Sequence, residues 1–320
     1  MIDGVLIGQY ERIGEGWLTG TTVVVCPEGA VGGVDSRGGA PGTRETDLLD
    51  PRNVVERVHA VMLTGGSAYG LAAATGIMEW LEQRRIGFPM GSPDRVVPLV
   101  PAAVLYDLGR GGEYRNRPTA EFGWNACEAA DSGPVRQGTV GAGTGASAGR
   151  FKGGIGHAEV RTSSGFTVGV VAAVNALGSI VERRTGRLFS DVAGTLPAPT
   201  AAELAAFPAP RRQGLNTTIG VVYTDARLTK AQCQRIAGAA HDGLAISIRP
   251  AHTMLDGDTV FALSTQDKTV DGIEEFDEVI AASADAFTEA IRSGLVAATS
   301  AGELRSYRDA CPSVFAGRPV

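Results

Sequence analysis

The order of strand-like and helix-like segments constrains the fold of this 320-residue chain more than any other feature. Two segments rich in β-branched residues, 160–164 and 166–175, are separated only by Gly165, which predicts an antiparallel pair. Elsewhere, strand-like and helix-like segments do not alternate as they do in βαβ units. The sequence therefore predicts an α+β protein with stacked sheets and outer helices, and argues against a doubly wound parallel sheet.

Composition and periodicity predict the remaining elements. Further strands are predicted at residues 21–26, 97–104, 217–224 and 260–264, and helices at residues 54–61, 67–83, 228–244 and 274–298. The helix at 228–244 has a start signal, because Thr229 and Gln232 have the spacing of a capping box. A chain of this length buries about three quarters of its unfolded surface, so its core needs no disulfide or metal.

Charge and residue types exclude several classes of function. Lys and Arg total 29 against 35 Asp and Glu, which gives a net charge of −6, so no nucleic-acid partner is expected. The four cysteines lack C-x-x-C spacing and the four histidines lie far apart, so no cofactor or metal is expected. The most apolar run, residues 168–174, is too short to span a membrane, and the first residues do not resemble a signal peptide. A cytoplasmic protein without a membrane partner is expected.

Residues 186–215 break the pattern, because they contain four prolines and many alanines. This composition predicts an exposed linker or a disordered loop. The segment runs directly into a predicted strand that begins near Asn216, and such a junction is easily accessible to chain cleavage.

Thr217 follows this junction and is the first candidate catalytic residue. A threonine hydroxyl is a weak nucleophile that needs an adjacent base. Cleavage before Thr217 would free its own α-amine, whose pKa near 7.7–8.0 suits it to accept the hydroxyl proton. The alternative is that Thr217 and Thr218 are ordinary β-branched strand residues.

Asp256 and Asp258 form the second candidate, in the sequence D-G-D. Residues i and i+2 of an extended segment project to the same face, so both carboxylates would point at one place. Such a pair can hold an ammonium group and raise its basicity. The alternative is a D-G turn with solvated carboxylates that leads into a strand.

The third candidate is the glycine-rich run at residues 141–150, GAGTGASAGR. It lacks both the P-loop ending and the G-x-G-x-x-G register, so it is a weak nucleotide motif. Close backbone packing beside a catalytic centre explains it better.

Taken together, these residues resemble the L-aminopeptidase/D-esterase family of self-processing N-terminal-nucleophile hydrolases. The resemblance covers most of the chain, in the order VDSRGGAPGTRETDLL (34–49), LTGGSAYGLAAATG (63–76), GAGTGASAGR (141–150), VNALG (174–178), LNTTIGVV (215–222), AHDG (240–243) and AHTMLDGDTVFALST (251–265). Threonine at 217 with two aspartates, in place of a serine nucleophile with a serine–carboxylate pair, resembles the nylon-oligomer (6-aminohexanoate oligomer) hydrolase branch most.

The resemblance implies a four-layer αββα sandwich formed by one domain, residues 1–320. It implies a cut between Asn216 and Thr217, which yields a larger chain 1–216 and a smaller chain 217–320 that stay together. Members are commonly tetramers, so a homo-oligomer is expected.

The resemblance also implies the roles of individual side chains. Thr217 would be the nucleophile, oriented by Asp256 and Asp258, and the Asn175 amide would donate to the oxyanion. Tyr106 would lie near the oxyanion or the substrate, and Arg150 or Lys152 would supply the positive charge near the nucleophile. The family pattern has a lysine at the position of Arg150. In an extended chain, the side chains of residues 150 and 152 would point the same way.

The function implied is hydrolysis of peptide or linear amide bonds through an acyl-threonine intermediate, with a small peptide or oligoamide as substrate. Two alternatives remain open at this point. One is acyl transfer, as in the ornithine acetyltransferases, and the other is a non-catalytic binding module that keeps the fold.

Overall fold

The computed structural model of the chain describes residues 1–92, 94–209 and 215–317. Its main sheet follows the order β10-β11-β12-β13-β2-β4-β7-β3, with β1 paired to β2. The strands of this path are β1 (Leu6–Gly14), β2 (Trp17–Ser36), β3 (Thr43–Arg44), β4 (Arg57–Thr64), β7 (Ala102–Val104), β10 (Gly154–Arg161), β11 (Thr167–Val174), β12 (Ile219–Ala226) and β13 (Thr259–Lys268). Two small hairpins are formed by β5 (Phe88–Pro89) with β6 (Val96–Val97) and by β8 (Ser147–Ala148) with β9 (Phe151–Lys152).

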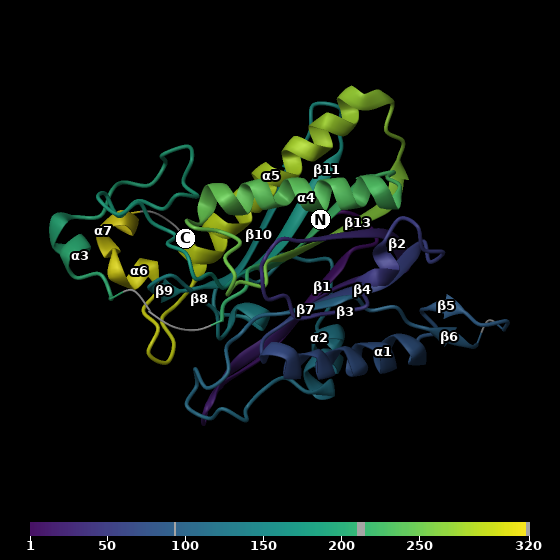
Figure 1. Cartoon of the computed structure of the whole chain (residues 1–320), viewed down its shortest axis with the longest axis horizontal. Helices are drawn as coiled ribbons and strands as arrows, with labels where there is room; N and C mark the ends of the chain where they lie inside the picture. Colours follow the sequence, from purple (N-terminus) through teal and green to yellow (C-terminus); the bar gives the residue numbers. More distant parts are fainter. Residues whose placement is uncertain (93, 210–214, 318–320) are drawn as a thin grey trace.

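Helices cover this strand path on both sides. The α-helices are α1 (Ala73–Gln83), α2 (Ala120–Glu128), α3 (Ala201–Ala205), α4 (Lys230–Ser247), α5 (Gly272–Ala297), α6 (Tyr307–Ala310) and α7 (Pro312–Phe315), and the 3-10 helices are η1 (Asp47–Leu49), η2 (Ser67–Ala72) and η3 (Gly141–Gly143). Helices α4 and α5 lie on one side of the strands and α1 and α2 on the other (Figure 1). Within the described ranges, no helix has the length and apolarity needed to cross a membrane.

The long strand β2 belongs to two layers of the molecule. Its residues 17–25 pair with β1, and its residues 31–36 pair with β13. A register shift between Val25 and Ala30 separates the two parts. This one strand therefore joins the sheet under α1 and α2 to the sheet under α4 and α5.

Among the described residues, three buried clusters of side chains lie between the four layers. Val170 packs with residues of α4 and α5, whereas its neighbour Val171 packs between the two sheets. In the other sheet, Val24 faces the same central cluster, whereas Val23 packs with residues of α1 and α2. Because successive strand residues point to opposite faces, each sheet is apolar on both faces. The predicted four-layer αββα sandwich is confirmed.

The predicted antiparallel pair and the capped helix are both present. Strands β10 and β11 pair antiparallel, with Arg161 opposite Thr167 at the turn. At the start of α4, the Thr229 hydroxyl accepts a hydrogen bond from Gln232 N, and Gln232 Oε1 accepts one from Thr229 N, which is a capping box. The helices predicted at 67–83 and 274–298 are present as η2 with α1 and as α5.

Two predicted elements are wrong. Residues 54–61 do not form a helix, because β4 begins at Arg57 and continues to Thr64. This strand is buried on both faces and reads as a nearly continuous apolar run, which periodicity alone cannot distinguish from a helix. The strand predicted at 97–104 is interrupted, with only Val96–Val97 and Ala102–Val104 in strand conformation.

The proline-rich segment is largely exposed, as predicted, but some of its residues are buried. Leu188 and Leu196 are buried in the cluster beside α4 and α5, and the Gly186 carbonyl oxygen accepts a hydrogen bond from the Tyr307 hydroxyl. Parts of this irregular segment therefore pack against the body of the protein, whereas most of its described residues, including much of the short helix α3, are exposed. The last part of the prediction, residues 210–214, lies outside the described residues.

Candidate active site

Thr217 lies just before β12 and is 5 % exposed. Its main-chain N–H donates to the carbonyl oxygen of Asn175 at 2.6 Å. Its hydroxyl donates to the carbonyl oxygen of Asn216 at 2.5 Å and accepts from Gly257 N at 3.1 Å. The hydroxyl is thus held against the peptide group at which the cut is predicted.

Asn216 pairs with the segment 255–257 as a one-residue parallel bridge to Asp256. Asn216 N donates to Leu255 O at 3.1 Å, and Gly257 N donates to Asn216 O at 3.1 Å. The Gly257 N–H therefore faces both the Thr217 hydroxyl and the carbonyl oxygen beside it. A donor in this position would stabilise negative charge that develops on that oxygen.

Glycine is required at position 257 by close packing. A Cβ atom there would lie 2.6 Å from the Ala40 carbonyl oxygen and 2.8 Å from the Thr217 hydroxyl oxygen. Both distances are well below normal van der Waals contact. The D-G-D sequence thus brings a main-chain N–H to the threonine, which the sequence analysis did not anticipate.

The structure places the two aspartates on either side of Gly257, each 2 % exposed. Asp258 Oδ1 accepts from Thr218 N at 2.8 Å, and its Oδ2 lies 2.9 Å from His252 Nδ1. Asp256 accepts from Leu177 N at 3.2 Å and from the Thr253 hydroxyl at 2.6 Å.

These contacts show which residues the two carboxylates bind. Asp258 binds Thr218, next to Thr217, and Asp256 binds Leu177, two residues after Asn175, so both position the site through its surroundings. Burial raises the pKa of Asp256, and the nearby Asp258 carboxylate raises it further. The aspartates are not solvated turn residues, which was the alternative for this motif.

Asn175 follows β11 and is completely buried. Its Oδ1 accepts from Ser147 N at 2.9 Å and from Arg110 Nη1 at 2.6 Å. Its Nδ2 makes a long contact of 3.4 Å to the main-chain oxygen of Tyr106. Because Ser147 N and Arg110 Nη1 both donate to Oδ1, the other end of the side-chain amide carries the donor, Nδ2. Tyr106 contributes to this arrangement through its main-chain oxygen.

Arg110 is a site residue that sequence reasoning missed. Besides Asn175, its guanidinium binds the side-chain oxygen of Asn216 (Nη2 to Oδ1, 3.0 Å) and the carbonyl oxygen of Gly145 (Nη1, 2.7 Å). It lies in a G-R-G-G loop, whose composition predicts only a turn. His252 and Thr253, which bind the two aspartates, were also missed, although they lie inside the motif at 251–265.

Lys152 and Arg150 have different surroundings. Lys152 is fully buried in β9, where its Nζ donates to Gly143 O at 2.7 Å and to Gly153 O at 2.8 Å. Burial holds its pKa well below the usual 10.5, and the Arg110 charge lowers it further. Arg150 lies in the turn between β8 and β9.

The turn also explains why the two cations do not point the same way, as an extended chain would require. Arg150 lines a cavity of about 590 Å³ together with Arg183 and Arg249. The cation that directly contacts the residue before the predicted cut is Arg110.

The glycine-rich run forms one wall of this site. Gly143 O, Gly145 O and Ser147 N bind Lys152, Arg110 and Asn175, respectively. These contacts agree with the close-packing interpretation of the run.

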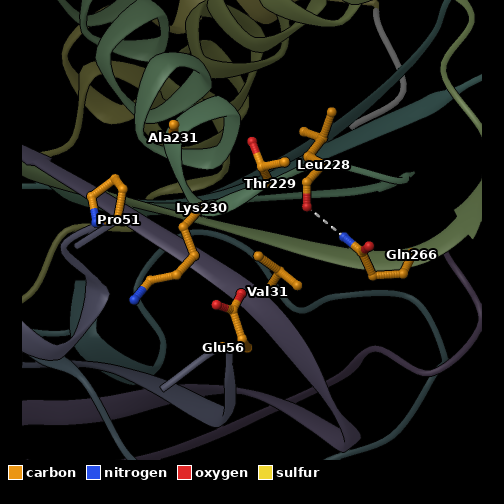
Figure 2. A pocket seen from close by; sticks show the side chains of 8 residues that line it. All are labelled: Val31, Pro51, Glu56, Leu228, Thr229, Lys230, Ala231 and Gln266. Carbon is orange, nitrogen blue, oxygen red and sulfur yellow. Dashed lines mark hydrogen bonds between the residues drawn. The ribbon is translucent and has the colours of Figure 1, made fainter. Parts of the chain in front are cut away.

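A second cavity of about 390 Å³ lies at the far end of β13, near Gln266 (Figure 2). Figure 2 shows Lys230 and Glu56 beside it. The Lys230 ammonium donates to the carbonyl oxygens of Leu48 and Asn53 at 3.0 Å each, so its hydrogen bonds serve the loop before β4. None of the site residues predicted from the sequence lines this cavity.

Comparison with known proteins agrees with this fold. The model of peptidase family S58 matches residues 2–307. An "uncharacterized aminopeptidase" of Mycobacterium tuberculosis is 49% identical over 98% of each chain. A 6-aminohexanoate-oligomer endohydrolase of Kocuria sp. is 32% identical over 82% of this chain and 74% of its own.

Among solved structures, the L-aminopeptidase D-Ala-esterase/amidase of Ochrobactrum anthropi superposes with a TM-score of 0.74 and 22% identity. The match covers 97% of this chain and 90% of that one, which is described as a variant of the Ntn hydrolase fold. The matched family model spans nearly the whole chain, and the fold agrees with it. The chain belongs to peptidase family S58.

Proposed function

We propose that this protein cuts itself between Asn216 and Thr217, and that Thr217 then acts as an N-terminal nucleophile in hydrolysing peptide or linear amide bonds. One observation carries the proposal. The Thr217 hydroxyl lies 2.5 Å from the Asn216 carbonyl oxygen, and Gly257 N–H donates to both oxygens. A nucleophile, its target and a donor for the developing charge are thus together.

The self-cleavage step follows from this arrangement. Thr217 Oγ1 bonds to the carbonyl carbon of Asn216, the C–N bond breaks, and the hydroxyl proton ends on the departing nitrogen. Water then hydrolyses the ester. The products are a carboxylate on Asn216 and a free α-amine on Thr217, within one folded domain made of chains 1–216 and 217–320.

Turnover repeats the same chemistry on a substrate. The Thr217 α-amine, held near the Asn175 carbonyl oxygen, takes the proton from the hydroxyl as it attacks the substrate carbonyl. The Asn175 amide and Gly257 N–H stabilise the oxyanion, and the C–N bond breaks as the Thr217 ammonium gives its proton to the leaving amine. Water then hydrolyses the acyl-threonine.

The charged residues support these steps from outside the reacting atoms. Asp258 fixes the chain just after Thr217 and Asp256 fixes the chain just after Asn175, and their negative charge favours a basic amine. Arg110 orients Asn175 and is the fixed positive charge, since a guanidinium stays protonated in proteins.

The substrate class comes from the relatives. One relative is named an aminopeptidase and another a 6-aminohexanoate-oligomer endohydrolase, so we propose short peptides and linear amides as substrates. A homotetramer in the cytoplasm completes the proposal, and light scattering of the purified protein tests the assembly.

Intact mass of freshly purified protein under denaturing conditions tests the self-cleavage. The 33.1 kDa chain should give pieces of about 22 and about 11 kDa, with the smaller one beginning at Thr217. Thr217→Ala should remain whole and inactive. The matched control is Thr218→Val, which removes the neighbouring buried hydroxyl and should still be cut. A cut Thr217→Ala protein would refute the proposal.

A further inference from the structure

Asn216 occupies a site that binds its main-chain N–H, its carbonyl oxygen and its side-chain oxygen. Its N–H donates to Leu255 O at 3.1 Å, and its carbonyl oxygen accepts from Gly257 N at 3.1 Å. Its side-chain oxygen accepts from Arg110 Nη2 at 3.0 Å. The residue is only 7 % exposed.

This site has a second use once the chain is cut. If Thr217 is the nucleophile for both reactions, the same hydroxyl must reach the same kind of carbonyl each time. In self-cleavage the acyl residue is Asn216, so a substrate's acyl residue occupies the corresponding place during turnover. On this condition, the contacts of Asn216 in the uncut chain are a template for those of the substrate's acyl residue.

We propose that Leu255, Gly257 and Arg110 form the subsite for the acyl residue of the substrate, and that it prefers a side chain with a hydrogen-bond acceptor at the position of the Asn216 amide oxygen. The inference rests on the proposed function. The substrate's α-amine binds Leu255 O, where Asn216 N–H binds in the uncut chain. Its side-chain carbonyl or carboxylate oxygen binds the Arg110 guanidinium.

The preference follows from the chemistry of a partly buried guanidinium. An apolar side chain in this place removes one acceptor from Arg110 without replacing it by water. Loss of a hydrogen bond to a charged group corresponds to about 10- to 100-fold in affinity or rate. Leucine has nearly the shape of asparagine, with the same branching at Cγ, but lacks the acceptor, so the two form a matched pair.

The test uses the mature enzyme with L-asparaginyl and L-leucyl p-nitroanilides. We expect kcat/KM to be about 10- to 100-fold higher for the asparaginyl substrate. Arg110→Met should bring this ratio close to one, even though it slows both substrates by disturbing Asn175. Arg115→Met, on the exposed part of the same loop, is the control and should keep the wild-type ratio.

The outcomes distinguish failure of the proposed subsite from failure of the proposed hydrolase function. Equal kcat/KM values, or faster cleavage of the leucyl substrate, overturn the subsite and leave the proposed hydrolase function intact. Cleavage of neither amide refutes the proposed function and the subsite with it.

A second measurement does not depend on whether Arg110→Met folds. Asn216→Leu should slow self-cleavage of the uncut chain by about 10- to 100-fold, for the same reason. Asn216→Asp, which keeps an acceptor for Arg110, should convert faster than Asn216→Leu. Equal rates for these two variants would contradict the subsite.

Discussion

Replacing Gly257 with alanine tests the arrangement around Thr217 directly. The added Cβ would lie 2.6 Å from Ala40 O and 2.8 Å from the Thr217 hydroxyl oxygen. Heavy atoms in contact normally lie about 3.5–4.0 Å apart, so the segment 256–258 must move by about 1 Å. Overpacking by one methyl group costs about 1–3 kcal/mol of stability, which a domain of this size tolerates.

The effect on cleavage should be much larger than the effect on stability. Movement of about 1 Å at a catalytic group costs about 100-fold, and loss of an oxyanion donor costs about 100- to 1000-fold. Self-cleavage of Gly257→Ala should therefore slow by about 100- to 1000-fold. The measurements are the fraction of cut chain over time, by intact mass, and the free energy of unfolding of the uncut protein, by urea denaturation.

Gly238→Ala is the matched control. This glycine lies within α4, and its added Cβ would meet only the side-chain ends of Asp35 and Arg37, at 3.3 and 3.4 Å. We expect cleavage at the wild-type rate and no loss of stability, since alanine favours helix over glycine. If Gly257→Ala is folded and cuts itself as fast as this control, Gly257 N–H does not serve the reaction and the reasoning is refuted.

Three further predictions concern buried polar groups. Asn175→Ala should lower the initial rate of amide hydrolysis by about 100- to 1000-fold, and an unchanged rate excludes Asn175 as an oxyanion donor. Burial lowers the pKa of Lys152 in the folded chain, so between that lowered pKa and 10.5 the unfolded chain binds more protons than the folded one. In this pH range, the free energy of unfolding of the wild type, measured by urea denaturation, should rise with pH relative to that of Lys152→Met. The rise should be at most about 1.4 kcal/mol per pH unit. Burial raises the pKa of Asp256, so wild type should lose stability relative to Asp256→Asn as pH rises above 3.8; parallel curves would contradict either assignment.

Local sequence patterns predicted elements whose signals act over a few residues. The start of α4 was predicted because its cap needs only Thr229 and Gln232, which bind each other directly. The pattern failed for β4, because both faces of this strand are buried and its residues show no alternation between apolar and polar. Whether an apolar run becomes a strand or a helix there depends on the layers that cover it.

By itself, the sequence determined which side chains are candidates for catalysis. Thr217 at the end of an irregular segment, and Asp256 and Asp258 around one glycine, were identified from neighbours in the chain. The tertiary structure decided how these groups are held. Arg110 binds Asn175 and Asn216 across 65 and 106 residues, and a contact at such separation depends on how layers pack.

The same holds for the two cations that the sequence could not distinguish. Arg150 and Lys152 are two residues apart, yet one lies in a hairpin turn facing a cavity and the other is fully buried beside the glycine-rich run. Spacing along a chain predicts a shared face only when the chain is extended. Here the β8–β9 turn breaks that condition, so only the folded structure gives these two cations their different surroundings.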